Sequence, residues 1–371
     1  MQTPDVIVIG GGIAGASVAY ELAASRTVLL LEAEASLAMH STGRSAATYI
    51  PGHGTATFRA LIRASAARFP ALAEELDAPP FLRPLTTVFT ALDADGEREL
   101  EVLQREWSAE PDGPRPLTGA ETDRACPGLR GSRAGAIVQA ADADAIGLHG
   151  AYVRGLRRRG GSVRRGARVT GIEPVGGCGG GIAGWRVETA TDGWTVPDVV
   201  VAAGAWTDTL AGLAGVRGAR LQPYRRTIAI SPCAVPAGMP MLIDAADRFY
   251  AKPEGDALLL SPSDETPVGP GDAKPDELDV ASALERTEEA LHLGLRSVRT
   301  AWAGLRTFAP DRDPVVGSRP EHPGFHFFAG HGGSGIESAP ALAALGAAVL
   351  TGAPVPADIP VTAARVSPAR L

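Results

Sequence analysis

The most constraining feature of the sequence is a glycine pattern that follows its first apolar run. Residues 5–10 read Asp-Val-Ile-Val-Ile-Gly, which is typical of a strand buried on both faces. A helical segment at residues 13–25 and a second apolar run at residues 27–32 come next. The turn between strand and helix carries a Gly-x-Gly-x-x-Gly pattern formed by Gly10, Gly12 and Gly15. This strand–turn–helix–strand order predicts a dinucleotide-binding unit.

Each glycine has a physical reason in such a unit. Gly10 permits the tight turn, Gly12 lets backbone N–H groups approach a pyrophosphate, and Gly15 lets helix and strand pack closely. The N-terminus of the helix stabilises the anion. Glu32 ends the second strand, 22 residues after Gly10, where its carboxylate can accept hydrogen bonds from a ribose diol. A chance glycine-rich turn is the alternative, and the pattern alone does not separate FAD from NAD.

Buried strands that end at glycine recur at residues 198–204 and 325–330, on either side of β-rich stretches. This arrangement predicts a discontinuous nucleotide-binding domain with a second domain inserted in two pieces. We expect the nucleotide-binding domain at residues 1–80, 145–215 and 322–371, and the inserted domain at residues 81–144 and 216–321. Helices are predicted at residues 55–77, 147–160 and 276–298, and from residue 338 onward.

Charge and cysteine content exclude several classes of protein. The chain has 35 Lys and Arg against 42 Asp and Glu, and a net charge of −7 argues against a general nucleic-acid binder. Cys126, Cys178 and Cys233 are few and far apart, so neither a disulfide framework nor a metal site is predicted. No apolar run reaches the length of a membrane span, and the N-terminal run lacks the cationic start of a signal peptide. We therefore expect a cytoplasmic protein.

Four further motifs follow the glycine pattern in order. They are His-Ser-Thr-Gly-Arg-Ser-Ala-Ala at residues 40–47, Ala-Ala-Gly-Ala-Trp at 202–206, Trp-Ala-Gly-Leu-Arg-Thr-Phe at 302–308 and Gly-His-Gly-Gly-Ser-Gly-Ile at 330–336. With the N-terminal pattern, they resemble the FAD-dependent D-amino-acid oxidase and glycine oxidase family over nearly the whole chain. Within that family, the resemblance is closest to the bacterial D-arginine dehydrogenases.

The resemblance implies an α/β fold: a Rossmann-like FAD-binding domain with an inserted antiparallel β-sheet substrate domain. It implies FAD as cofactor, and we expect non-covalent binding because no cysteine lies in the last glycine motif or beside Arg306. The implied reaction is oxidation of an amino acid at Cα by hydride transfer to the flavin, with a D-amino acid as the leading substrate. The electron acceptor stays open between O2, a quinone and another molecule.

Three other functions remain open at this point. The substrate could be a secondary amine, either glycine-like, sarcosine-like or a modified amino acid. A 2-hydroxy acid would need the same carboxylate-binding arginine. A flavoprotein that only binds, or that serves as one subunit of a larger dehydrogenase, is the alternative from another class.

Arg306 matches the carboxylate-binding arginine of the family, because a guanidinium makes two parallel charge-assisted hydrogen bonds to a carboxylate. Tyr250 matches a tyrosine whose hydroxyl assists, and Arg226 matches a further substrate-binding arginine. An ion pair of Arg306 with Asp311 or Asp313 is the structural alternative.

His53 is a candidate to accept the proton of the substrate ammonium, since histidine titrates in the physiological range. A loop histidine without a chemical role is the alternative. Ser334 and Glu337 are candidates for substrate contact, and His331 lies near the start of the last glycine motif. The helix that this motif opens would direct its N-terminus at the flavin, where the helix dipole favours the reduced, anionic state.

The residues expected to bind the cofactor come from all five motifs, together with Glu32, Ala33 and Val169. They are Gly10, Gly12, Ile13, Ala14, Gly15, Glu32, Ala33, Ser41, Thr42, Ser45, Ala46, Ala47, Val169, Ala203, Gly204, Trp206, Gly304, Gly332, Gly333, Ser334, Gly335 and Ile336.

The chain departs from the D-arginine dehydrogenase pattern at several substrate positions. It has Thr48 in place of a histidine, His53 in place of a tyrosine and Glu337 in place of a glutamine. The glutamate expected to pair with a cationic side chain is replaced by Leu85, or by Thr87 if the register shifts. Because a buried cation without a partner is costly, D-arginine itself is not the expected substrate.

Overall fold

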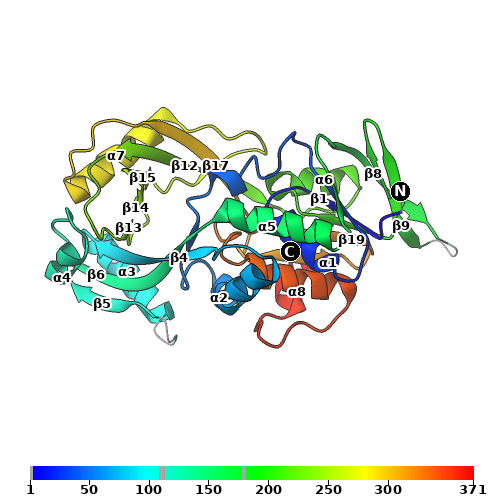
Figure 1. Cartoon of the computed structure of the whole chain (residues 1–371), viewed down its shortest axis with the longest axis horizontal. Helices are drawn as coiled ribbons and strands as arrows, with labels where there is room; N and C mark the ends of the chain where they lie inside the picture. Colours follow the sequence, from blue (N-terminus) through cyan, green and yellow to red (C-terminus); the bar gives the residue numbers. More distant parts are fainter. Residues whose placement is uncertain (1–2, 108–109, 111–112, 178–180) are drawn as a thin grey trace.

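The computed structural model describes residues 3–107, 110, 113–177 and 181–371, so Cys178 lies outside the described residues. Figure 1 shows an elongated molecule with a sheet toward each end. The six-stranded sheet lies toward one end with α1, α5, α6 and α8, and the larger sheet lies toward the other with α3, α4 and α7. This division agrees with the α/β fold that the resemblance implies.

The six-stranded sheet is built on the N-terminal strand–helix–strand unit. Its strand order is β18 (Val315–Ser318), β19 (Phe325–Ala329), β11 (Asp198–Val201), β1 (Val6–Ile9), β2 (Val28–Leu31) and β7 (Ser162–Arg164). The strands from β19 to β7 are parallel, and β18 runs antiparallel to β19. Both faces of this sheet are covered, which explains why its central strands are apolar without alternation.

Helices cover one face of this sheet and a small sheet covers the other. Val8, Leu30 and Val200 share a core with the helices α1 (Ile13–Leu22), α2 (Ala56–Glu75), α5 (Ala145–Arg158) and α8 (Ala339–Thr351). Ile7 and Val199, which alternate with them, pack on β8 (Val169–Gly176), β9 (Ile182–Thr189) and β10 (Gly193–Val196). The carboxyl ends of β1, β11 and β19 therefore meet at one edge of a rigid layer.

The larger sheet is mixed rather than purely antiparallel. Its order is β16 (Thr266–Pro267), β12 (Gln222–Pro232), β15 (Ala257–Ser261), β14 (Tyr250–Glu254), β13 (Met241–Asp244), β4 (Leu82–Ala91), β6 (Ala134–Ala143) and β3 (Thr48–Tyr49). In addition, β17 (Thr300–Phe308) pairs with β12, and β5 (Arg115–Thr118) pairs with β6. β13 and β4 come from the two separate inserted stretches, and their parallel pairing joins these stretches in one sheet.

The chain crosses between the sheets at places that differ from the predicted ends of the domains. β18 lies in the six-stranded sheet, so the return crossing precedes the predicted boundary at residue 322. β3, expected in the nucleotide-binding domain, instead extends the larger sheet. The division into two domains stays a proposal, with these two strands moved.

Several shorter elements complete the chain. They are α3 (Ala94–Trp107), α4 (Gly119–Ala125), α6 (Thr207–Leu213), α7 (Glu277–Leu291) and α9 (Ala363–Val366), with 3-10 turns at Thr42–Arg44, Gly204–Trp206 and Pro368–Arg370. The helix predicted at residues 276–298 ends early because His292 is left-handed, with φ of 49°. None of the helices in the described parts of the chain is both long and apolar enough to cross a membrane.

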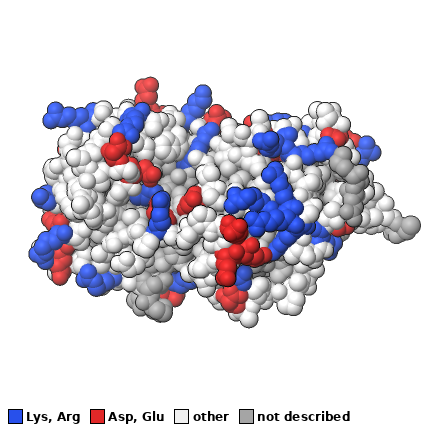
Figure 2. Space-filling view, viewed as in Figure 1, with Lys and Arg blue, Asp and Glu red and all other residues white. Residues whose placement is uncertain are grey.

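Charged side chains of both signs are interspersed on the face shown in Figure 2. Where Lys and Arg gather on it, acidic side chains lie directly beside them.

Candidate active site

The first glycine turn has geometry that only glycine satisfies. Gly10 has φ of +116°, and a Cβ there would lie 2.5 Å from the carbonyl oxygen of Ala202. A Cβ on Gly15 would lie 1.8 Å from the carbonyl oxygen of Gly10. The turn is thus held tightly between β11 and α1, with the N-terminus of α1 directed at the space beyond it.

Glu32 closes this turn from the end of β2. Its Oε2 accepts the N–H of Gly11 at 2.7 Å, and its Oε1 accepts the N–H of Glu34 at 2.8 Å. On the other side, Thr42 Oγ1 accepts the N–H of Ile13 at 3.0 Å. Each carboxylate oxygen has a second lone pair, so Glu32 can still accept a ribose hydroxyl.

A single cavity runs from this turn to the larger sheet. Most residues predicted to bind the cofactor line it, namely Gly10, Gly12, Ile13, Ala14, Glu32, Ala33, Ser41, Thr42, Ser45, Ala46, Val169, Ala203, Gly204, Trp206, Gly304, Gly332, Gly333, Gly335 and Ile336. Three do not. Gly15 packs behind the turn, the N–H of Ala47 bonds to Ser45 Oγ, and Ser334 is buried beside His53. A direct contact of these three residues with the cofactor stays a prediction.

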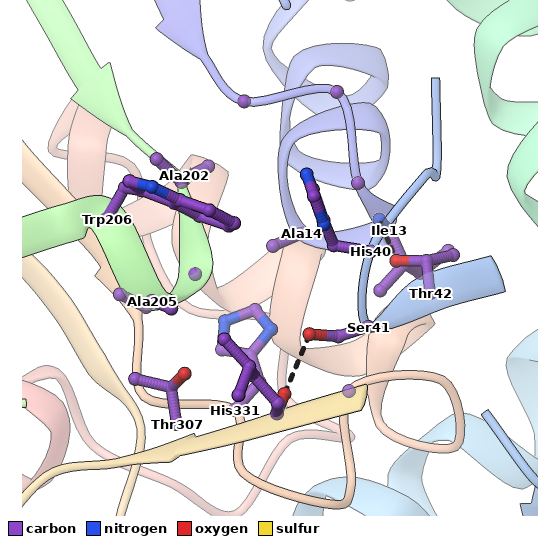
Figure 3. Close-up of a pocket in the computed structure, with 18 of the residues that line it drawn as sticks. Ile13, Ala14, His40, Ser41, Thr42, Ala202, Ala205, Trp206, Thr307 and His331 are labelled. Carbon is purple, nitrogen blue, oxygen red and sulfur yellow. Dashed lines mark hydrogen bonds between the residues drawn. The ribbon is translucent and has the colours of Figure 1, made fainter. Parts of the chain in front are cut away.

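The cavity also exposes residues that the sequence analysis left out of the cofactor set. His40 and Trp206 lie with their ring centroids 4.7 Å apart on its wall, and Thr307 and His331 lie together below them (Figure 3). Ser41 Oγ donates to the carbonyl of Leu305 at 2.7 Å, which joins the first motif loop to β17 (Figure 3). His40, Thr307 and His331 all lie within the quoted motifs, so the signal that could have found them was present.

The register of β12 and β17 explains how two arginines come to face this cavity. Tyr224 lies opposite Arg306, and Arg226 lies opposite Gly304. Residues directly opposite each other share a face of the sheet, so Arg226 and Arg306 are diagonal neighbours on one face. Both line the cavity, and Gly304 leaves room there because it has no side chain.

Arg306 makes no hydrogen bond or ion pair with any residue that the structure describes. The two aspartates considered as partners are engaged elsewhere: Asp311 with Arg370, and Asp313 with Thr55, Thr57 and Arg365. A Cβ on Gly333 would lie 3.1 Å from Cζ of Arg306, so the last glycine motif packs directly against the guanidinium.

The surroundings of Arg306 disfavour its charge. Burial lowers the pKa of its guanidinium, and the nearby charge of Arg226 lowers it further, against the opposing effects of Tyr250, Asp247 and Glu265. An incoming carboxylate would relieve this penalty. The guanidinium is therefore well suited to bind an anion.

Unpartnered polar atoms collect around the cavity. Among the described residues, five buried polar atoms on its wall lack a hydrogen-bond partner: His40 Nδ1, Arg226 Nε, Tyr250 Oη, Thr307 Oγ1 and His331 Nε2. Because buried polar groups are nearly always paired, such a cluster indicates a site for a polar ligand. Tyr250 and Arg226 are only 5% and 4% exposed as whole residues, so a ligand that reaches them is shielded from solvent.

His53, Ser334 and Glu337 are not among the residues that line the cavity, so their predicted roles in the reaction and in substrate contact stay predictions. Glu337 is buried, and its two oxygens bind His53 Nδ1 at 2.5 Å and the N–H of Ile50 at 2.9 Å. Ser334 Oγ lies 3.3 Å from the same ring nitrogen. Both contacts use one nitrogen, so this group is no relay of the Ser–His–Glu kind. It fixes the loop before α2 to the start of α8.

The FAD that the sequence resemblance implies fits the residues of the cavity. The glycine turn and the N-terminus of α1 suit a pyrophosphate, Glu32 suits a ribose, and the unpartnered polar atoms suit the remaining polar groups. Cys126 and Cys233 do not line the cavity. Neither of these two cysteines is therefore placed to hold a flavin covalently.

His331 gives a testable pH dependence of stability. Burial lowers the pKa of its ring to about 4, whereas the ring titrates near pH 6.5 in an unfolded chain. Between these values the unfolded state takes up a proton that the folded state does not, so stability falls as the pH falls through this window. Between about pH 7 and pH 4, we expect the free energy of unfolding of the flavin-loaded protein to fall by up to about 3 kcal/mol more than that of the His331→Gln variant. Urea unfolding at a series of pH values measures the difference, and parallel profiles would contradict it.

Comparison with known proteins adds independent findings. Residues 5–349 match the family described as FAD dependent oxidoreductase. The chain is 28% identical to a glycine oxidase of Pseudomonas putida, over 95% of this chain and 96% of that protein. It is 27% identical to a glycine oxidase of Bacillus licheniformis, over 95% and 94% of the two chains.

Solved structures share the fold. A glycine oxidase from Geobacillus kaustophilus superposes with a TM-score of 0.87 at 22% identity, covering 100% of both chains. An L-proline dehydrogenase from P. horikoshii superposes with a TM-score of 0.84 at 20% identity, covering 100% of this chain and 98% of the other. These likenesses bear out the Rossmann-like domain with an added sheet domain.

Proposed function

The chain belongs to the family of FAD-dependent oxidoreductases, and from this premise we propose that it oxidises an α-amino carboxylate at the carbon that bears the amine. It is an enzyme of the amino-acid oxidase and glycine oxidase type, acting on CH–NH2 or CH–NH groups. The observation that carries the proposal is the free guanidinium of Arg306, which faces the same cavity as the dinucleotide turn. The substrate is then an anion held beside the cofactor.

Arg306 is proposed to bind the substrate carboxylate through two parallel hydrogen bonds, which fix the plane of that group. The hydroxyl of Tyr250 donates a further hydrogen bond, and Arg226 contributes positive charge from the neighbouring strand. Held in this way, the α-carbon has a defined position relative to the cavity wall. Bound flavin supplies the two-electron acceptor for the hydride that leaves this carbon.

The proton and nitrogen chemistry needs little from the protein. The substrate ammonium first gives a proton to water, and loss of hydride from the neutral amine leaves an iminium. Water then adds at the carbon, and the products are a 2-oxo acid and ammonium. His53, outside the cavity, is not part of this proposal.

The matched glycine oxidases support an amine substrate over a 2-hydroxy acid. Glycine and N-alkyl glycines are therefore the first substrates to test, followed by D-amino acids. Release of ammonia or an alkylamine in equal amount to the 2-oxo acid is expected on turnover. Formation of a 2-oxo acid from a hydroxy acid without ammonia would overturn the proposal.

Removal of the Tyr250 hydroxyl tests the second contact. Tyr250→Phe keeps the ring in its apolar cluster but removes the donor, so we expect KM to rise about tenfold or more with little change in bound flavin. Tyr49→Phe is the matched control, because Tyr49 lies on β3 of the same sheet and outside the cavity lining. Steady-state kinetics on both variants provide the measurement, and an unchanged KM in Tyr250→Phe would contradict the assigned contact.

A further inference from the structure

Glu265 lies outside the cavity lining and binds one of the two guanidiniums that face the cavity. Its Oε1 accepts Nη2 of Arg226 at 3.3 Å. Arg226 and Arg306 line the cavity, whereas Glu265 does not. Glu265 therefore offsets the charge of Arg226 from outside the space that a substrate would occupy.

Two other acidic residues near β12, Asp264 and Asp279, pair with Arg225 rather than with Arg226. Arg225 precedes Arg226, and side chains alternate along a strand, so it points to the opposite face of the sheet. There it pairs with Asp279 at 2.7 Å and with Asp264 at 3.5 Å. Among the described residues, the carboxylate in contact with Arg226 is that of Glu265.

Arg312 holds Glu265 in position. Its two terminal nitrogens contact both Glu265 oxygens at 2.8–3.2 Å, and its guanidinium lies 3.7 Å from the ring centroid of Phe308. Burial raises the pKa of Glu265, but the hydrogen bond from Arg312 and the charges of the nearby arginines lower it overall. Glu265 is thus negatively charged at neutral pH.

We propose that Glu265 determines the charge of the substrate that this cavity accepts. With the charge of Arg226 paired to Glu265, Arg306 is left to bind one carboxylate, and a second carboxylate meets no guanidinium whose charge is unpaired. The substrate class is then an α-amino monocarboxylate, and acidic amino acids are discriminated against. This inference rests on the proposed function, because it takes Arg306 as the carboxylate-binding group.

Binding of acetate and malonate to the flavin-loaded protein tests the inference without turnover. Each titration is followed by the change in flavin absorbance, and the two dissociation constants are compared. The unmodified protein should bind malonate no more tightly than acetate. Glu265→Gln keeps the shape of the side chain and removes its charge, so the preference for malonate over acetate should rise at least about tenfold.

Asp279→Asn is the matched control, because it removes the same charge beside Arg225 on the opposite face. It should leave the ratio of the two constants unchanged. The increased preference of Glu265→Gln for malonate over acetate should disappear when Arg226→Gln is added. An equal shift in Asp279→Asn, no shift in Glu265→Gln, or persistence of the gain without Arg226 would each overturn the inference.

If Glu265→Gln does not fold, the two dissociation constants of the unmodified protein still test the inference. Malonate bound more than about tenfold more tightly than acetate would contradict the inference directly. Failure of every amino acid to reduce the flavin would contradict the proposed function, whereas these binding constants would still report on Glu265. The two failures are therefore distinguishable.

Discussion

Arg306→Ala is expected to lower kcat/KM for the amino acid substrate on the order of 10³-fold. The guanidinium has no partner among the described residues, so substrate binding would complete its hydrogen bonds. Removing one member of a buried charge pair costs about 3–5 kcal/mol. The loss should fall on both KM and kcat, because the same contact holds the α-carbon in its reacting position.

The control for this variant is Arg299→Gln. Arg299 directly precedes β17, the strand that carries Arg306, but its ion pair with Asp256 is exposed, so its loss should change kcat/KM little. The kcat/KM of Arg306→Lys should lie between those of Arg306→Ala and Arg299→Gln, because an ammonium keeps the charge but cannot make two parallel hydrogen bonds. Full activity in a flavin-loaded Arg306→Ala protein would contradict the assignment of the carboxylate site.

Gly10→Ala is expected to abolish most FAD binding. The φ of +116° at this position is strained for alanine. The added Cβ would also lie 2.5 Å from the carbonyl oxygen of Ala202, the residue that follows β11. The turn must then open, which displaces the N–H groups that would face the pyrophosphate. The ratio of flavin to protein in the purified sample measures the effect.

Gly212→Ala is the matched control for the glycine turn. Gly212 lies within α6, and a Cβ there would meet no atom within 4 Å. This change should leave the flavin content unchanged and stabilise the fold by about 0.5–1 kcal/mol, because alanine favours a helix more than glycine does. Normal flavin content in Gly10→Ala would show that the turn tolerates a side chain and would contradict the role given to it.

The nucleotide-binding half was predictable because its signals are local. Gly10 and Glu32 lie within one strand–helix–strand unit, and so does the close approach of Gly15 to the carbonyl oxygen of Gly10. The parallel pairing of β1 and β2 follows from the helix that connects them, and β11 is a further buried apolar strand that pairs with β1. Here the chemistry of a short segment determines its own geometry.

The contacts that define the far end of the cavity are long-range, and local patterns do not specify them. His53 and Glu337 are 284 residues apart, and their pairing keeps both away from the cavity. The partners of Glu265 come from β12 and from the turn after β17, which no single motif contains. Likewise, β13 and β4 become parallel neighbours only once two separate inserted stretches fold together.

Anaerobic reduction of the bound flavin tests the central claim most directly. The flavin-loaded protein is mixed, without oxygen, with glycine, N-alkyl glycines, D-amino acids and 2-hydroxy acids in turn, and the yellow absorbance is followed. We predict bleaching by at least one α-amino monocarboxylate, and slower or no bleaching of Arg306→Ala by the same compound. Unchanged colour with every amine, or bleaching that does not depend on Arg306, would contradict the account.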